Sequence, residues 1–159
     1  MLGENYFPPM NESHVSSRRG KGLQVVMEAI LKHRPSVIYL CPTKGVNINL
    51  LPLIMMNNIP IRLVFPSKHF FTTLSAEDKI ILDFASNTAD KIIMLGEEKC
   101  DPLRWSEDWY HASKKVVDNS DFVILVHNNG ETTEAFEDLV SRFQDNPKPV
   151  LAVGFDVEE

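Results

Sequence analysis

Cysteine is scarce in this chain, and its scarcity excludes two classes of fold. Only Cys41 and Cys100 occur among 159 residues, far apart and in different contexts. Two isolated cysteines cannot build the disulfide framework of a small secreted domain or supply the paired ligands of a structural zinc site. The five histidines show no metal-ligand spacing either. We therefore predict no metal site and no resident cofactor, and we expect Cys41, inside an apolar run, to be a buried thiol.

Long apolar runs and an excess of basic charge are also missing. No run approaches the ~20 residues that span a bilayer, and the N-terminus has neither the basic start nor the apolar core of a signal peptide. The net charge of −6 weighs against a nucleic acid as the main partner, because phosphate neutralisation needs a basic face. We expect a cytoplasmic protein whose partners include neither a membrane nor a nucleic acid.

The chain does contain short apolar runs separated by segments of helical length. The runs do not alternate between apolar and polar residues, which is typical of strands covered on both faces of a parallel sheet. Crossovers between such strands are right-handed. We predict an α/β fold, a three-layer Rossmann-like domain with a five-stranded, mainly parallel sheet in the order 3-2-1-4-5. The strands are expected at residues 37–41, 61–65, 91–95, 122–126 and 149–153.

Helical spacing appears between these runs and before the first of them. Residues 1–17 show no period and contain Pro8-Pro9, so we expect an extended N-terminal arm that packs on the domain or on a partner subunit. Residues 18–159 are then a single domain. We place the second helix start near Asn49, because Pro52 is harmless only in a first turn. The expected helices are 19–34, 49–57, 75–86, 107–119 and 132–144.

Polar turns follow the first two predicted strands, at the edge where parallel sheets hold ligands. Thr43, Lys44 and Gly45 follow the first strand. A glycine lets backbone amides approach an anion, the next helix adds its positive end, and the lysine adds charge. The turn is not a Walker A loop, and a tight solvent turn explains it equally well. Pro66 and Ser67 follow the second strand, where an exposed loop is the alternative.

The third and fourth strands are followed by an aromatic cluster and by a turn rich in hydrogen-bonding groups. Trp105 and Tyr110 come after the longest irregular stretch, and such rings sandwich a nucleobase or build a subunit interface. Asn129, Gly130 and Thr132 precede the last helix and offer hydrogen bonds at its positive end. The alternative for this turn is simple helix capping by Thr132.

Two stretches of the chain resemble the SLOG superfamily of Rossmann-like proteins, which includes the Smf/DprA and Lonely Guy proteins. Residues 37–49 and 58–67 resemble that group's first strand, its Gly-Val-Asp helix start and its "viPf" strand end, with Asn47 in place of the aspartate. Residues 109–126 resemble the block "aromatic…Arg-Asn…mvd.sD.liav", with Lys114 and Lys115 in place of Arg-Asn. The resemblance implies a nucleotide-related ligand at the strand ends, with Asn47 beside it, and a common habit of forming homodimers.

The chain also departs from that group. Relatives begin with a strand that ends in a Gly/Arg phosphate motif, whereas we expect this chain to begin with a helix. Residues 128–135 lack the Gly-Gly-x-Gly-Thr-x-x-Glu pattern of the phosphoribohydrolase branch. A nucleoside deoxyribosyltransferase-like relative, also built on a flavodoxin-like sheet, is a second resemblance.

We therefore predict a small-molecule binding domain for a nucleotide or nucleotide-derived ligand at the C-terminal ends of the strands. Two alternatives stay open. One is an N-glycosidic bond hydrolase or transferase acting on nucleosides or their monophosphates, with Glu134 or Glu131 as the acid near the anomeric carbon. The other is a degenerate, non-catalytic interaction domain.

Overall fold

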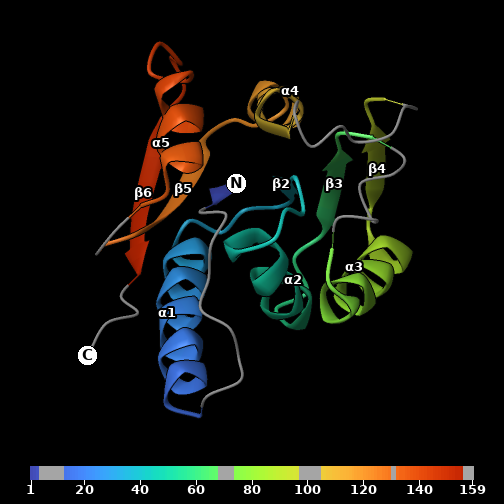
Figure 1. Cartoon of the computed structure of the whole chain (residues 1–159), viewed down its shortest axis with the longest axis vertical. Helices are drawn as coiled ribbons and strands as arrows, with labels where there is room; N and C mark the ends of the chain where they lie inside the picture. Colours follow the sequence, from blue (N-terminus) through green and yellow to red (C-terminus); the bar gives the residue numbers. More distant parts are fainter. Residues whose placement is uncertain (4–12, 68–73, 97–104, 130–131, 156–159) are drawn as a thin grey trace.

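Strands and helices alternate through the described parts of the chain, as the sequence predicts (Figure 1). The computed structural model describes residues 1–3, 13–67, 74–96, 105–129 and 132–155. The helices are α1 (Ser13–Lys32), α2 (Val46–Met56), α3 (Ala76–Thr88), α4 (Trp105–Asp118) and α5 (Glu134–Ser141). The strands are β1 (Leu2–Gly3), β2 (Ile38–Leu40), β3 (Ile61–Phe65), β4 (Lys91–Met94), β5 (Val123–Asn128) and β6 (Val150–Phe155).

The strands form two three-stranded parallel sheets, in the orders β2-β3-β4 and β1-β5-β6. A hydrogen bond links the two sheets: the Met1 amino group donates to the Tyr39 carbonyl oxygen at 2.7 Å. Two residues further on, Gly3 lies against Asn47, just beyond the carboxyl end of β2. β1 therefore runs beside β2 in the same direction, and Figure 1 shows it between β5 and β2.

The prediction of one five-stranded sheet in the order 3-2-1-4-5 is wrong, because it omits β1. The neighbour pairs β2–β3, β3–β4 and β5–β6 are confirmed. The expected pairing of β2 with β5 is replaced by β1, which aligns Leu2 with Leu125 and Gly3 with Val126. A strand of two residues is too short to show a period, so its place depends on the partners it meets.

Three helices begin earlier than predicted, and α4 does so by only two residues, at Trp105. α1 starts at Ser13, inside the segment expected to be an arm. α2 starts at Val46 rather than near Asn49, so Pro52 lies inside the helix, where it cannot donate an intrahelical hydrogen bond. α3 follows its capping signature, because the Ser75 hydroxyl accepts from the Asp78 amide at 3.2 Å.

Helices cover both faces of the strands (Figure 1). On one face, residues of α1, α2 and α3 pack on both sheets in a cluster that includes Ile30, Leu40, Leu63 and Ile124. On the other face, Trp109 of α4 and Phe136 of α5 pack on Tyr39, Cys41 and Val64. The Cys41 thiol is buried, as predicted. Within the described ranges, no helix has both the length and the apolar character needed to cross a bilayer.

Candidate functional site

The turn after β2 leads directly into the buried first turn of α2. Gly45 is the residue before the helix, and its φ of 103° is a backbone conformation that favours glycine. No side chain caps the helix, and its first turn contains no acidic residue. As in every helix, the first amides have no acceptor within the helix itself. The predicted role of Gly45, to let backbone amides approach an anion, stays a prediction.

Three polar side chains are buried at this edge, each with an atom that has no hydrogen-bond partner among the described residues. They are the hydroxyls of Thr43 and Ser67, which follow β2 and β3, and the amide oxygen of Asn47 in α2. Their exposed fractions are 2% for Thr43, 5% for Ser67 and 2% for Asn47. A buried polar atom without a partner costs about 1–3 kcal/mol. We refer to Thr43, Asn47 and Ser67 as the edge trio.

Asn47 connects the ends of β1 and β2. Its side-chain nitrogen donates to the Cys41 carbonyl oxygen at 2.9 Å. A Cβ placed on Gly3 would collide with the Asn47 side-chain oxygen, so only a glycine at the end of β1 leaves room for it. Gly3 is a residue of this edge that the sequence does not reveal, because a glycine near a chain end carries no pattern of its own.

Lys44 and Pro66 lie at the same edge as the edge trio. Lys44 is exposed, and Pro66 is half-buried at the end of β3.

Two other buried hydroxyls in the described segments lack a partner, those of Ser86 and Ser113. Ser86 lies near the end of α3, where the Asp90 amide donates to the Ile61 carbonyl at the start of β3. It is therefore at the opposite edge, whereas the edge trio gathers where the strands end.

The turn after β5 lies two strand positions away from the turn after β2. Neighbouring strands are about 4.8 Å apart, so β1 separates the two turns by roughly 10 Å. Asn129 lies beside Gly154 of β6, and its amide donates to the Phe155 carbonyl oxygen at 2.9 Å. The side chain of Asn129 is thus placed over β6, on the far side of β5 from the edge trio. The predicted residues Gly130 and Glu131 lie outside the described ranges.

The start of α5 corrects the expected cap. Thr133, not Thr132, is the capping residue, and its hydroxyl accepts from the Phe136 amide at 3.2 Å. The Thr132 hydroxyl instead donates to the Glu137 carboxylate at 2.5 Å. Glu134, the predicted acid, is exposed in the first turn of α5.

Tyr110, predicted to stack on a ligand, packs between α4 and α5. The Arg142 guanidinium carbon lies 4.9 Å from the centre of the Tyr110 ring, and the Phe143 ring lies 5.5 Å from it. These contacts join Tyr110 of α4 to the two residues that follow α5. Trp105 is the first residue of α4, and its side chain lies outside the described part of the structure.

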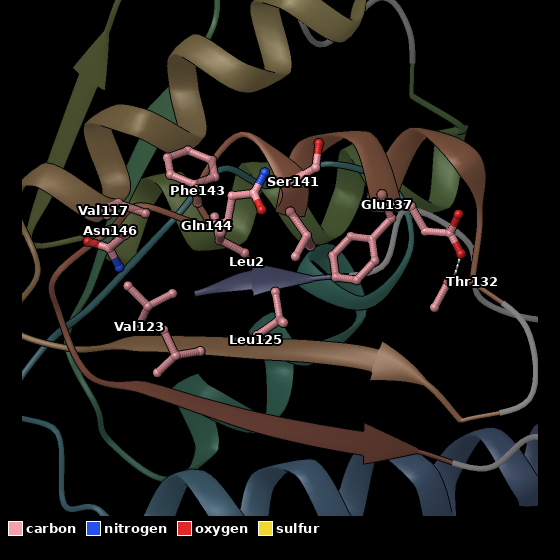
Figure 2. Close-up of a pocket in the computed structure, with 13 residues that line it drawn as sticks. Leu2, Val117, Val123, Leu125, Thr132, Glu137, Ser141, Phe143, Gln144 and Asn146 are labelled. Carbon is pink, nitrogen blue, oxygen red and sulfur yellow. Dashed lines mark hydrogen bonds between the residues drawn. The ribbon is translucent and has the colours of Figure 1, made fainter.

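A cavity of about 520 Å³ lies beneath α5, against the sheet that contains β1 (Figure 2). Figure 2 shows Leu2, Val123 and Leu125 on the strand side, with Thr132 and Glu137 together at one end. Its size and its largely apolar lining are typical of small-molecule pockets. No sequence pattern predicts it, because its walls come from β1, α4, β5, α5 with its flanking turns, and β6. Its lining residues are Leu2, Val117, Val123, Leu125, Thr132, Phe136, Glu137, Val140, Ser141, Phe143, Gln144, Asn146 and Val150.

Neither metal ligands nor known relatives identify the site. The part of the chain that the structure describes contains no group of three His, Cys, Asp or Glu side chains able to hold a metal ion. Comparison with protein-family models finds no match, and comparison with curated proteins finds none either.

Proposed function

We propose that this chain binds a small phosphate-bearing ligand of the nucleotide kind at the edge formed by the ends of β1, β2 and β3. The observation that carries the proposal is the pair of buried, unpartnered hydroxyls of Thr43 and Ser67 beside the uncapped start of α2. The Ile48 amide already donates to the Thr43 carbonyl oxygen at 3.2 Å. An anion held there accepts from the Val46 and Asn47 amides and from the Thr43 and Ser67 hydroxyls. It thereby offsets the cost of burying those groups without partners.

The capped helices α3 and α5 show why the start of α2 is distinctive. Their first turns each contain two acidic residues and are capped by Ser75 and Thr133. Their positive ends are thus already neutralised by the protein's own side chains. α2 has neither a cap nor an acid, and the exposed Lys44 adds positive charge to the same turn. These features favour an external anion at α2.

Two further observations support a nucleotide-like ligand over a simple anion. The resemblance to the SLOG superfamily implies such a ligand, and β1 supplies a leading strand, which this group has and which the sequence pattern did not predict here. The cavity beneath α5 lies on the other face of β1, because Leu2 lines it while the adjacent Gly3, which faces the opposite way, lies against Asn47. With its phosphate at α2, the ligand passes over the carboxyl end of β1 and places a flat, apolar part in this cavity.

Calorimetric titration with nucleotides, sugar phosphates and inorganic phosphate tests the proposal. We expect binding of at least one nucleotide, weakened about tenfold or more by Thr43→Val and by Ser67→Ala, since each removes a hydrogen bond to a charged group worth about 1.5–3 kcal/mol. Without ligand, Thr43→Val should stabilise the fold by about 1 kcal/mol, because it removes an unpaired hydroxyl.

Ser86→Ala is the matched control, because it removes a buried, unpartnered hydroxyl at the opposite edge. It should leave the affinity unchanged. A folded protein that binds nothing in the panel, or that loses affinity equally in all three variants, contradicts the proposal.

The N-glycosidic alternative gains no specific support from the geometry, because Glu134 is exposed and Glu131 lies outside the described ranges. The same samples test it, because release of free base from nucleosides or their monophosphates is directly measurable by chromatography. If the protein releases free base and the variant Glu134→Gln does not, the function of this edge is catalysis and not binding alone.

A further inference from the structure

A second cavity, of about 540 Å³, lies between the C-terminal ends of α2 and α3, two helices that lie side by side (Figure 1). Ile61, the first residue of β3, and Asp90, just before β4, both line it. It is therefore at the edge of the sheet opposite to the edge trio, and it shares no residue with the proposed phosphate site. Its volume is typical of small-molecule pockets. We refer to it as the α2–α3 groove.

The walls of the α2–α3 groove are apolar. Met55 and Ile59 line the side formed by the end of α2, Pro60 follows them, and Phe84 lines the side formed by α3. Phe84 is 61% exposed, so most of this large apolar side chain has no cover. Thr88, one helical turn after Phe84, places its hydroxyl 3.4 Å from the Met55 sulfur and joins the two walls. A flat ring between Phe84 and Met55 gains both aromatic and sulfur–aromatic contacts.

The electrostatic field at the groove is negative. Two helices end beside it, and neither has a basic residue in its last turn. Each C-terminal end has a partial charge of about −0.5. The Asp90 carboxylate adds a full negative charge, which its ion pair with Arg62 at 2.8 Å balances. No basic residue lines the groove in the described chain, so the two helix ends decide the sign of the field and favour a cation.

Asp90 also offers a well-positioned hydrogen-bond acceptor. Its Oδ2 atom accepts from the Arg62 Nε atom at 2.8 Å, and Arg62 is itself held by a second bond, to the Tyr39 hydroxyl at 2.6 Å. Among the described residues, no donor reaches the other carboxylate oxygen of Asp90. An ammonium group has three N–H donors and no acceptor, so it can donate to this oxygen. A carboxylate in the same place would be repelled.

We propose that the α2–α3 groove binds a small organic cation that carries a flat apolar ring, a ligand of the arylalkylamine class. The ring lies between Met55 and Phe84, and the ammonium group donates to Asp90 beside the two helix ends. Such an amine is charged at neutral pH, as the lysine side chain is. The net charge of −6 on the whole chain favours the approach of a cation further. The chain then holds two ligands of opposite charge at opposite edges of its strands.

Titration with tryptamine, followed by NMR through the methionine methyl signals, tests the proposal. We expect the Met55 signal to shift and to saturate, whereas the signal of Met27, which is buried in the core, stays in place. Indole-3-propionate is the matched control ligand, because it has the same ring and the same two-carbon chain but ends in a carboxylate. It should move neither signal.

Two pairs of variants locate the contacts. Asp90→Asn should weaken tryptamine binding about tenfold, because it replaces a charged acceptor by a neutral one. Asp83→Asn makes the same change of charge at an exposed position of α3 outside the groove and should leave the affinity unchanged. Phe84→Ala should weaken binding about fivefold or more, because it removes one face of the ring contact. Ile80→Ala truncates another exposed apolar residue of α3, outside the groove, and should not.

Three results would overturn the proposal. They are a Met55 signal that tryptamine does not move, a signal that moves equally with indole-3-propionate, and an affinity for tryptamine that neither Asp90→Asn nor Phe84→Ala lowers. Thr43→Val changes only the phosphate site and should leave tryptamine binding as it is, so the two proposed sites stand or fall separately.

Discussion

At the level of single residues, the main feature is the burial of polar atoms. The edge trio keeps three atoms without partners, whereas the buried Met1 amino group is used to join the two sheets through Tyr39. Burial lowers the pKa of the Met1 amino group from 8.0 to about 5. The folded protein therefore holds this amine neutral at pH values where the unfolded chain holds it charged.

This difference predicts a pH dependence of stability. Above pH 8 the amine is neutral in both states and has no effect. Between pH 8 and about 5 the unfolded chain binds the extra proton, so the free energy of unfolding should fall as the pH is lowered, by up to about 4 kcal/mol. Urea unfolding across this range measures the slope.

N-terminal acetylation is the control for this slope, because an acetylated amine does not titrate. Whatever its absolute stability, the acetylated protein should lack the part of the slope that comes from Met1. Equal slopes in the two forms would show that the amine is not buried as described.

At the level of helices and strands, β1 decides how the candidate site is built. It inserts two residues between β2 and β5 and brings Gly3 against Asn47. Gly3→Ala should destabilise the fold by about 1–3 kcal/mol, because its new methyl group would meet the Asn47 oxygen and the Val46 side chain. Gly96→Ala, which meets only the Pro66 carbonyl oxygen at 3.1 Å, should cost less. Urea unfolding of the two variants measures both costs.

A double-mutant cycle identifies the contact responsible. In an Asn47→Ala background the Asn47 oxygen is gone, so Gly3→Ala should cost less than it does in the unaltered chain. The same cost in both backgrounds would mean that β1 does not approach α2 in the way the structure shows.

Across the molecule as a whole, the two sheets share one core. The cluster beneath α1, α2 and α3 combines Leu40 and Leu63 of one sheet with Ile124 and Val153 of the other. If either sheet lost its contacts with this cluster, the buried side chains that the other sheet contributes to the cluster would become exposed. The predicted single domain over residues 18–159 stays a prediction.

A shared core predicts that both sheets unfold together. Leu40→Ala should destabilise the molecule by about 2–5 kcal/mol, because Leu40 is fully buried. Hydrogen exchange should then speed up equally at the amides of β3 and β5. Faster exchange in β2, β3 and β4 alone would instead show two independently stable halves.

Local patterns in the residues were enough to predict the α/β class, five of the six strands and the existence of all five helices. Continuous apolar runs and helical spacing are local features that do not depend on tertiary contacts, so the sequence alone reveals the strands and helices that they mark. Polar turns at strand ends are equally visible, and they pointed to Thr43, Gly45 and Ser67. The place of β1, the contact between Gly3 and Asn47, the packing of Tyr110 and the cavity beneath α5 emerged only from the folded chain. Each of these depends on residues far apart in the sequence, and a two-residue strand has no period by which a pattern could locate it.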